Sequence, residues 1–145
     1  MRKPRKIFLA TSLVILENDK LLLSLRKNTG WYDGQYSLVS GHFELGELVL
    51  DASMREAKEE IGIDVKPDDL SVAHIMHRRG DDGERVDFFV RVQRWKGHPK
   101  NNEPDRCEEI SWFPLNALPE NLVPPAQVGL DAIRRGLFFS EHGWE

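Results

Sequence analysis

The stretch from Gly41 to Ile63 constrains the fold most, because a glycine-marked turn leads directly into a helix-forming run. Residues 47–61 contain no Pro or Gly and are rich in Glu, Ala, Leu, Met, Lys and Arg, which favour helices. Gly62 follows, and glycine commonly closes a helix. The sequence therefore predicts a helix of about four turns over residues 47–61.

Three acids of this helix are expected to lie close together. At about 100° per residue, Glu56, Glu59 and Glu60 share an arc of about 100°. The face beside them is apolar and consists of Leu50, Met54, Ala57 and Ile61. Three carboxylates on one arc repel one another unless a cation lies between them. A solvated acidic surface is the ordinary alternative for adjacent glutamates.

The nearby bases favour a metal site over a solvated surface. Lys58 projects away from the acidic arc, and Arg55 is expected to reach only its edge, at Glu59, four residues along the helix. Hard carboxylate oxygens without Cys or paired His nearby suit Mg²⁺, with Mn²⁺ as a substitute. Such ions neutralise phosphates and lower the pKa of a bound water. The pattern therefore predicts phosphate chemistry.

At these residues the chain resembles the Nudix hydrolase family. Its signature is Gly, five residues, Glu, seven residues, then Arg-Glu-aliphatic-any-Glu-Glu-any-Gly-aliphatic, and residues 41–63 match every fixed position, with Ala57 as the small apolar residue. Many members carry a second glycine before the first one, where this chain has Ser40. The resemblance implies a small, MutT-like α/β protein, an α/β/α sandwich with a mixed β-sheet between helices.

The same resemblance implies roles for individual residues. Glu56, Glu59 and Glu60 would be catalytic and bind the metal, and the Gly41 carbonyl would be a further ligand. Glu47 and Arg55 would form a supporting ion pair between loop and helix. For an additional acid beyond the signature, Glu103 ranks ahead of Glu108 and Glu109, although a solvated loop acid explains each of them equally well.

Three residues before the signature are candidate substrate contacts. Trp31 and Tyr36 could stack on a nucleobase, since aromatic faces bind flat rings without sequence preference. Core packing is the alternative for either ring. Arg26 could contact phosphate, because its guanidinium suits bidentate pairing.

The predicted function is Mg²⁺-dependent hydrolysis of a pyrophosphate bond in a nucleoside diphosphate derivative. The leading substrate is a nucleoside triphosphate, oxidised and noncanonical ones included, cut to the monophosphate and pyrophosphate. The alternatives are an ADP-ribose or nucleotide-sugar pyrophosphatase, or a non-catalytic nucleotide-sensing module. The intact set of helix acids argues against the sensing module.

The bulk properties agree with a small-molecule enzyme. A chain of 145 residues fits a single domain over residues 1–145, with the first six as a flexible basic tail. A net charge of -4 argues against a stable nucleic-acid complex. Cys107 is the sole cysteine, and no apolar run approaches about 20 residues, so we expect a cytoplasmic protein without a membrane partner. A homodimer is left open.

Hydrophobic patterning outlines the remaining elements. We expect a hairpin from residues 7–16 and 21–26, a loop over 27–35, and extended segments at 36–40, 63–65, 71–77, 85–95 and 110–113. Pro124 and Pro125 would begin a second helix. Its apolar residues would be Val128, Leu130, Ile133 and Leu137.

Overall fold

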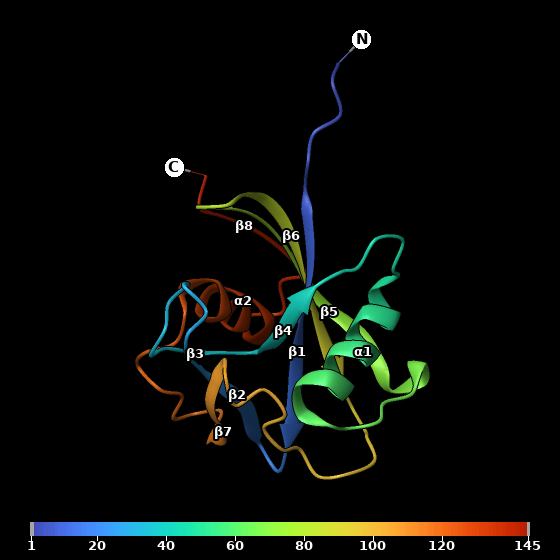
Figure 1. Ribbon diagram of the computed structural model, residues 1–145. Coiled ribbons are helices and arrows are strands. Elements are labelled where there is room, and N and C mark those ends of the chain that lie inside the picture. The colour runs from blue at the N-terminus through green and yellow to red at the C-terminus, as the bar shows by residue number, and fades with distance from the viewer. Residues whose placement is uncertain (1, 145) are drawn as a thin grey trace.

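In the computed structural model, which describes residues 2–144, a mixed β-sheet lies between two helices (Figure 1). The helices are α1 (Val49–Ile61) and α2 (Pro124–Arg134), with a short 3₁₀ turn, η1 (Pro67–Asp69). The strands are β1 (Phe8–Glu17), β2 (Lys20–Arg26), β3 (Tyr36–Ser37), β4 (Val39–His42), β5 (Leu70–Gly80), β6 (Gly83–Val92), β7 (Cys107–Pro114) and β8 (Phe139–His142).

Strand β1 organises the sheet. Within residues 2–144, eight strands follow the path β3-β2-β1-β6-β5-β8, with β4 added on β1 and β7 on β2. One edge of β1 pairs with β6 in parallel, and the other pairs first with β4 and then, near its end, with β2. The sheet therefore divides at β1: β6, β5 and β8 lie on one side of it, and β4, β2, β3 and β7 lie on the other.

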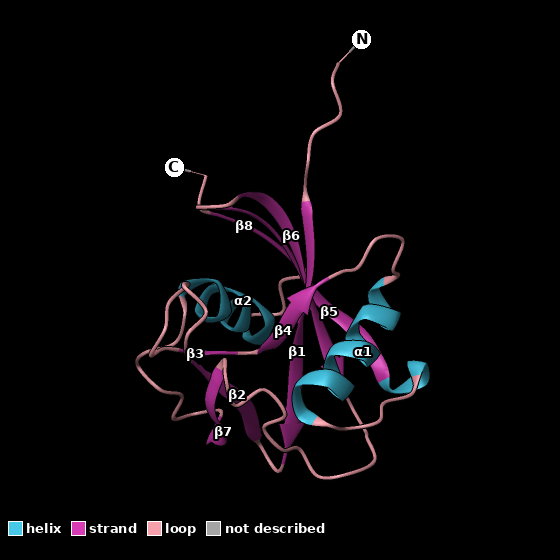
Figure 2. Ribbon diagram, in the orientation of Figure 1, coloured by secondary structure: helices cyan, strands magenta, loops and turns pink. Residues whose placement is uncertain are grey.

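Two hydrophobic clusters fix the helices on opposite faces of the sheet (Figure 2). Ala57 and Ile61 of α1 are buried in one cluster, and Leu50 and Met54 pack against it. This confirms the apolar face predicted for the helix. The second cluster contains Phe89 and Met76, with Val128, Leu130 and Ile133 of α2 packed against it. The α/β sandwich expected from the sequence is confirmed.

Several predicted boundaries are wrong. Helix α1 begins at Val49 rather than at residue 47, because Leu48 is extended (φ -84°, ψ 158°) and the chain before it is held in the turn. Helix α2 ends at Arg134, and Gly136 then adopts a φ of +74°. Leu137 consequently lies beyond α2 and is 43% exposed.

Other corrections concern strands. Residues 63–65 form a single bridge, Asp64 with Lys96, instead of a strand. The segment 36–40 is divided between β3 and β4. Strand β8 was not predicted. It pairs in parallel with β5 from Ile75 to Arg78, and this pairing, rather than local alternation, defines it.

Residues 2–7 extend away from the sheet without regular structure (Figure 1). The Arg5 guanidinium nevertheless contacts the Glu84 carboxylate on β6. The single domain, the flexible tail and the homodimer stay predictions. In the described part of the chain, no helix is long and apolar enough to cross a membrane.

Candidate active site

The turn between β4 and α1 brings Gly41 against the acidic side of the helix. Antiparallel pairing of β4 with β1 places Gly41 opposite Thr11. A Cβ built on Gly41 would lie 2.2 Å from Cδ and Oε1 of Glu56. Glu56 is itself only 5% exposed. The strand backbone and a buried carboxylate can approach this closely only because residue 41 has no side chain.

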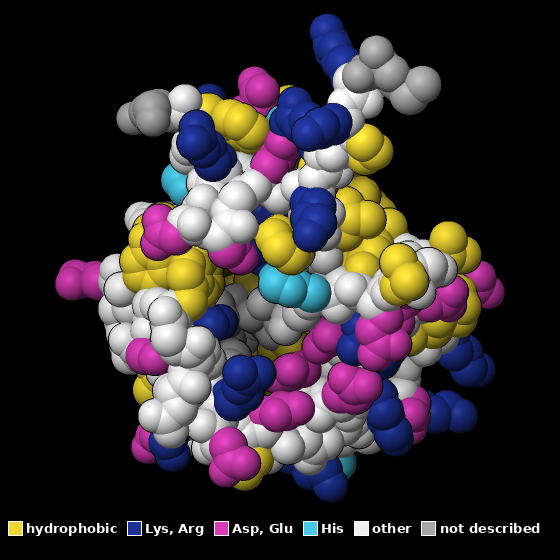
Figure 3. All heavy atoms as spheres, turned by 45° about the horizontal axis from the view of Figure 1, so that its top comes forward, with side chains coloured by type: hydrophobic (Ala, Val, Ile, Leu, Met, Phe, Trp, Pro, Cys, Tyr) yellow, Lys and Arg dark blue, Asp and Glu magenta, His cyan; other side chains and the backbone are white. Residues whose placement is uncertain are grey.

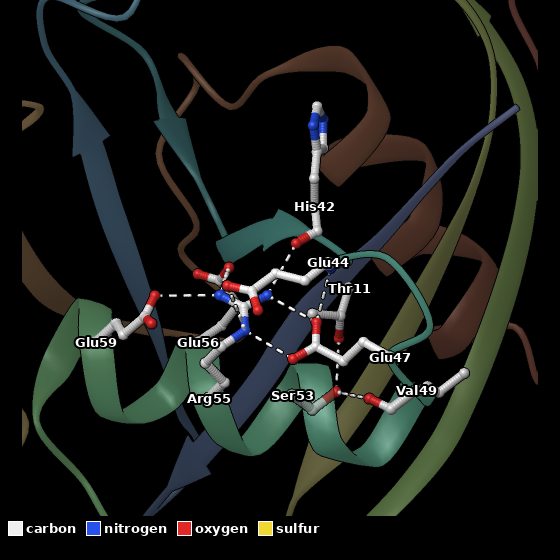
Figure 4. Close-up of polar contacts among 9 residues, drawn as sticks. All are labelled: Thr11, His42, Glu44, Glu47, Val49, Ser53, Arg55, Glu56 and Glu59. Atoms are coloured by element: carbon white, nitrogen blue, oxygen red, sulfur yellow. Dashed lines mark hydrogen bonds and ion pairs between the residues drawn. The ribbon is translucent and has the colours of Figure 1, made fainter. Parts of the chain in front are cut away.

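Arg55 links the turn to the helix (Figure 4). Its Nε and Nη2 donate to the two carboxylate oxygens of Glu47 at 2.7 and 2.9 Å, and Nη2 also donates to the His42 carbonyl at 3.0 Å. The backbone N–H of Glu44 donates to Glu47 at 2.9 Å. Hydrogen bonds from Arg55, then that from Glu44, lower the pKa of Glu47 to about 2.

The same guanidinium reaches further into the acidic arc than the sequence predicted. Arg55 Nη1 donates to Glu59 Oε2 at 3.1 Å, as expected, but also to Glu56 Oε1 at 2.8 Å. The prediction that Arg55 reaches only the edge at Glu59 is therefore wrong. The long side chain lies back along the helix surface toward the neighbouring carboxylate.

Glu60 lies one turn after Glu56 on α1 and lacks this compensation. Among residues 2–144, its carboxylate has no ion-pair or hydrogen-bond partner. Burial, followed by the charges of Glu56, Glu103 and Glu59, raises the pKa of Glu60 to about 7. Burial also raises the pKa of Glu56, against the opposing effect of Arg55. Both acids therefore lie where a negative charge is costly without a cation.

Glu103 lies in the loop before β7, near the C-terminal end of α1. The backbone N–H of Asn102 donates to the Glu60 carbonyl at 3.0 Å, which ties the loop before β7 to the helix. The charge of Glu103 contributes to the raised pKa of Glu60. Glu108 instead pairs with Lys27 at 3.4 Å, and Glu109 accepts from Tyr36 at 2.7 Å.

The donor set fits a hard divalent cation, although it is not pre-assembled. In the described residues, no three His, Cys, Asp or Glu side chains already converge as a metal site. Glu56 and Glu59 each turn one oxygen toward Arg55 and have a second oxygen to offer. With the uncompensated Glu60, they form an all-oxygen set of the kind that Mg²⁺ or Mn²⁺ prefers.

A cavity of about 680 Å³ opens beside these acids. Figure 3 shows a hollow surrounded by acidic and basic side chains. Glu56 and Glu60 line it, together with Arg26 and Trp31, two of the three predicted substrate contacts. Tyr36 is not among the lining residues. Its hydroxyl donates to Glu109, and its ring packs edge-on against Phe113. This position agrees with the packing alternative for Tyr36 rather than with base stacking.

Other cavity residues were not assigned to the site from the sequence. They come from β5, β6 and the loop before β7, and include Arg78, Arg85, Asp87 and Arg106. One signal was available for Asp87, which is the sole acid in the otherwise apolar run from Val86 to Val90 of β6. An acid there is expected to be buried and paired.

Comparison with known proteins agrees with this fold. The NUDIX domain family matches residues 7–132. The chain is 28% identical over 122 residues to an 8-oxo-dGTP diphosphatase from Escherichia coli strain K12, covering 84% of this chain and 91% of that protein. It is 31% identical over 106 residues to an ADP-ribose pyrophosphatase from Methanocaldococcus jannaschii, covering 73% of this chain and 62% of that protein.

A solved structure shows the same architecture. A MutT NUDIX hydrolase from Burkholderia pseudomallei superposes with a TM-score of 0.80 at 25% identity, covering 88% of this chain and 98% of that one. Other curated relatives are longer, and the chain spans about a third of their length. The chain belongs to the Nudix family. It is accordingly an enzyme that hydrolyses pyrophosphate bonds in nucleotide derivatives.

Proposed function

We propose that the chain hydrolyses a nucleoside triphosphate to the monophosphate and pyrophosphate, with Mg²⁺ as cofactor and Mn²⁺ as a substitute. The observation that carries this proposal is the pair Glu56 and Glu60 in the wall of a cavity of about 680 Å³ that Arg26 and Arg106 also line. Acids that need a cation lie beside bases suited to phosphate oxygens. The 8-oxo-dGTP diphosphatase, which this chain covers almost completely, supports a triphosphate substrate.

The proposed metal ligands are the carboxylates of Glu56, Glu59 and Glu60 and the carbonyl of Gly41. Glu103, in the loop before β7, is proposed as a further acid. Support comes from the free oxygens of Glu56 and Glu59, the raised pKa of Glu60 and the close approach at Gly41. When bound, a divalent cation would neutralise phosphate charge and make water a stronger nucleophile near neutral pH.

The protein's own contribution is positioning. Arg55 and Glu47 hold the β4–α1 turn against the helix, so that the acids keep their spacing. Arg26 is directed by its hydrogen bonds to the Trp31 carbonyl (2.6 Å) and to the Thr29 hydroxyl (2.8 Å). Its fixed guanidinium would hold a phosphate group in line for attack by water.

An ADP-ribose-type substrate is the second candidate, and a specific observation favours it. A cavity of about 440 Å³ shares Trp31, Arg78, Asp81 and Pro125 with the first. The two spaces together could accommodate a nucleoside diphosphate carrying a second large group. The resemblance to an ADP-ribose pyrophosphatase points the same way.

A hydrolysis screen separates these candidates. Nucleoside triphosphates, oxidised variants, ADP-ribose and nucleotide sugars are incubated with and without Mg²⁺, and the products are resolved. Metal-dependent release of a monophosphate and pyrophosphate supports the proposal. Preferential cleavage of ADP-ribose or a nucleotide sugar supports the second candidate. Metal-dependent binding without turnover would instead identify a nucleotide-sensing module, which overturns the proposal. The Glu60→Gln protein is the control for contaminating activity.

A further inference from the structure

The wall of the cavity contributed by β5 and β6 carries a buried polar cluster of Arg78, Asp87 and Arg85. Asp87 is 4% exposed, and its Oδ2 accepts a hydrogen bond from Arg78 Nε. Its Oδ1 is buried without a hydrogen bond, and so is the Nε atom of Arg85, in the part of the chain that the structure describes. These two atoms lie 3.4 Å apart, an ion-pair distance at which neither satisfies the other.

An unsatisfied acceptor beside an unsatisfied donor is costly in a folded protein. A buried polar atom without a hydrogen bond has lost its water partner and gained no other, and this cluster holds two such atoms. Neighbouring contacts keep the pair in place. Arg85 Nη2 lies 3.1 Å from the His42 ring, and Arg78 holds the other oxygen of Asp87. Asp87 and Arg85 both line the cavity, so a ligand there would reach these two covered atoms by displacing their side chains.

The surrounding wall suits a flat ring. Arg85, Asp87 and Phe89 alternate along β6 and therefore face the same side of the sheet. Leu38 and Val123 line the same cavity and are apolar. Apolar walls with a few fixed polar groups are the usual construction of a small-molecule site. The acids of α1 belong to the phosphate end, so this wall is available to the other end of the substrate.

We propose that Asp87 and Arg85 read the nucleobase of the substrate. Asp87 Oδ1 accepts a hydrogen bond from a base N–H, and Arg85 Nε donates to the adjacent carbonyl oxygen or ring nitrogen. Base edges present such donor and acceptor groups side by side. Because Arg78 occupies Oδ2, Asp87 reads a single N–H. The inference rests on the proposed function only for the placement of the phosphates.

The test uses ligand pairs that differ in one N–H. The pairs are ATP with purine riboside triphosphate, CTP with pyrimidin-2-one riboside triphosphate, and GTP with N1-methyl-GTP. Each ligand is used as its α,β-methylene analogue and is titrated calorimetrically in the presence of Mg²⁺. The α,β-methylene analogue of ribose triphosphate, which has no base, is titrated in the same way. We expect the wild type to bind the N–H member of at least one pair at least about tenfold more tightly, because losing that group leaves Asp87 unpaired.

The Asp87→Asn variant should reverse the preference. Arg78 will hold the amide oxygen, so the amide NH₂ will occupy the position of Oδ1 and oppose a base N–H. Arg85→Met preserves the Arg78–Asp87 pair and is the second variant if Asp87→Asn does not fold. It should weaken base-bearing ligands at least about fivefold more than the base-free ligand. Arg94→Met, which removes an exposed arginine outside the cavity, should leave both ratios unchanged.

The outcomes distinguish this inference from the proposed function. Equal losses for base-bearing and base-free ligands would show that the cluster is structural and overturn the inference, as would a wild type that does not discriminate within any pair. Hydrolysis without base discrimination leaves the proposed function intact and removes this site. Base discrimination without hydrolysis supports this site and overturns the proposed function.

Discussion

Gly41 and Glu56 are in such close contact that a single methyl group at residue 41 would overlap the glutamate carboxylate, at 2.2 Å from its Cδ. Strand β4 and helix α1 meet at this point, and the proposed metal site depends on their separation. The contact explains why the signature needs glycine here. The backbone conformation of Gly41 is not left-handed, so the requirement is one of space.

Replacing Gly41 with Ala should therefore destabilise the protein and reduce turnover. Overpacking of this kind costs about 1–3 kcal/mol, and the displaced carboxylate should lower kcat/KM at least about tenfold. Urea unfolding without metal measures the first effect and steady-state kinetics the second. In a Glu56→Ala background the stability cost should nearly vanish. An equal loss of unfolding free energy in both backgrounds would show that the methyl group clashes with a group other than Glu56.

Replacing Glu60 with Gln should abolish most turnover yet stabilise the metal-free protein at pH 8. The folded-state pKa of Glu60 is raised to about 7, so its ionised form is disfavoured in the fold. The wild type should lose stability as pH rises from about 4.5 through about 7, whereas the variant should not. Allowing for solvent screening, the gain at pH 8 should be about 1 kcal/mol.

Metal titration supplies the control for Glu60. Saturating Mg²⁺ should remove the stability advantage of Glu60→Gln, because the cation compensates the carboxylate in the wild type. Thermal unfolding of both proteins at pH 5 and pH 8, with and without Mg²⁺, measures their stability under these four conditions. Glu108→Gln, which removes a largely exposed acid of β7, should show neither effect. Full activity of Glu60→Gln would refute the metal role.

The Glu47–Arg55 pair should make stability depend on pH at the acidic end. Since the folded-state pKa of Glu47 is lowered to about 2, its contribution is complete above about 4.5 and is lost as pH falls through about 2. Glu47→Gln should cost about 1–2 kcal/mol at pH 7, and the difference should shrink toward pH 2. Urea unfolding at pH 7, 4 and 2.5 checks this, with exposed Glu120→Gln as a control. A difference in unfolding free energy that does not change with pH would show that the charge of Glu47 is not the source of the stabilisation.

A buried hydroxyl pair anchors α1 to β1. Thr11 and Ser53 are fully buried and lie 2.8 Å apart through their hydroxyl oxygens, and Ser53 also donates to the Val49 carbonyl (Figure 4). Ser53→Ala should cost about 1–3 kcal/mol, because it leaves the Thr11 hydroxyl unpaired. Adding Thr11→Val should recover part of that loss, since both partners are then apolar. Additive losses in urea unfolding would show that the two hydroxyls act independently.

The sequence by itself determined the features that depend on short separations along the chain. The turn at Gly41 and the helix that carries Glu56, Glu59 and Glu60 follow from spacing within 23 residues, and the family resemblance of the same stretch implied the pairing of Glu47 with Arg55. Helical geometry fixes which side chains share a face once the helix forms. The first hairpin followed for the same reason, because its turn and its two apolar runs are adjacent.

Only the tertiary structure decided which distant residues meet. The register of β5 on β6 and the packing of α2 place Arg78, Asp87 and Arg85 in the cavity. Tyr36 of β3 packs against Phe113 of β7 instead of lining the cavity, because both strands pair with β2, and pairing with β5 defines β8. Sheet register and helix packing reflect the burial of the whole core, which local propensity does not encode. The acidic helix could therefore be predicted from the sequence, whereas the far wall of its cavity could not.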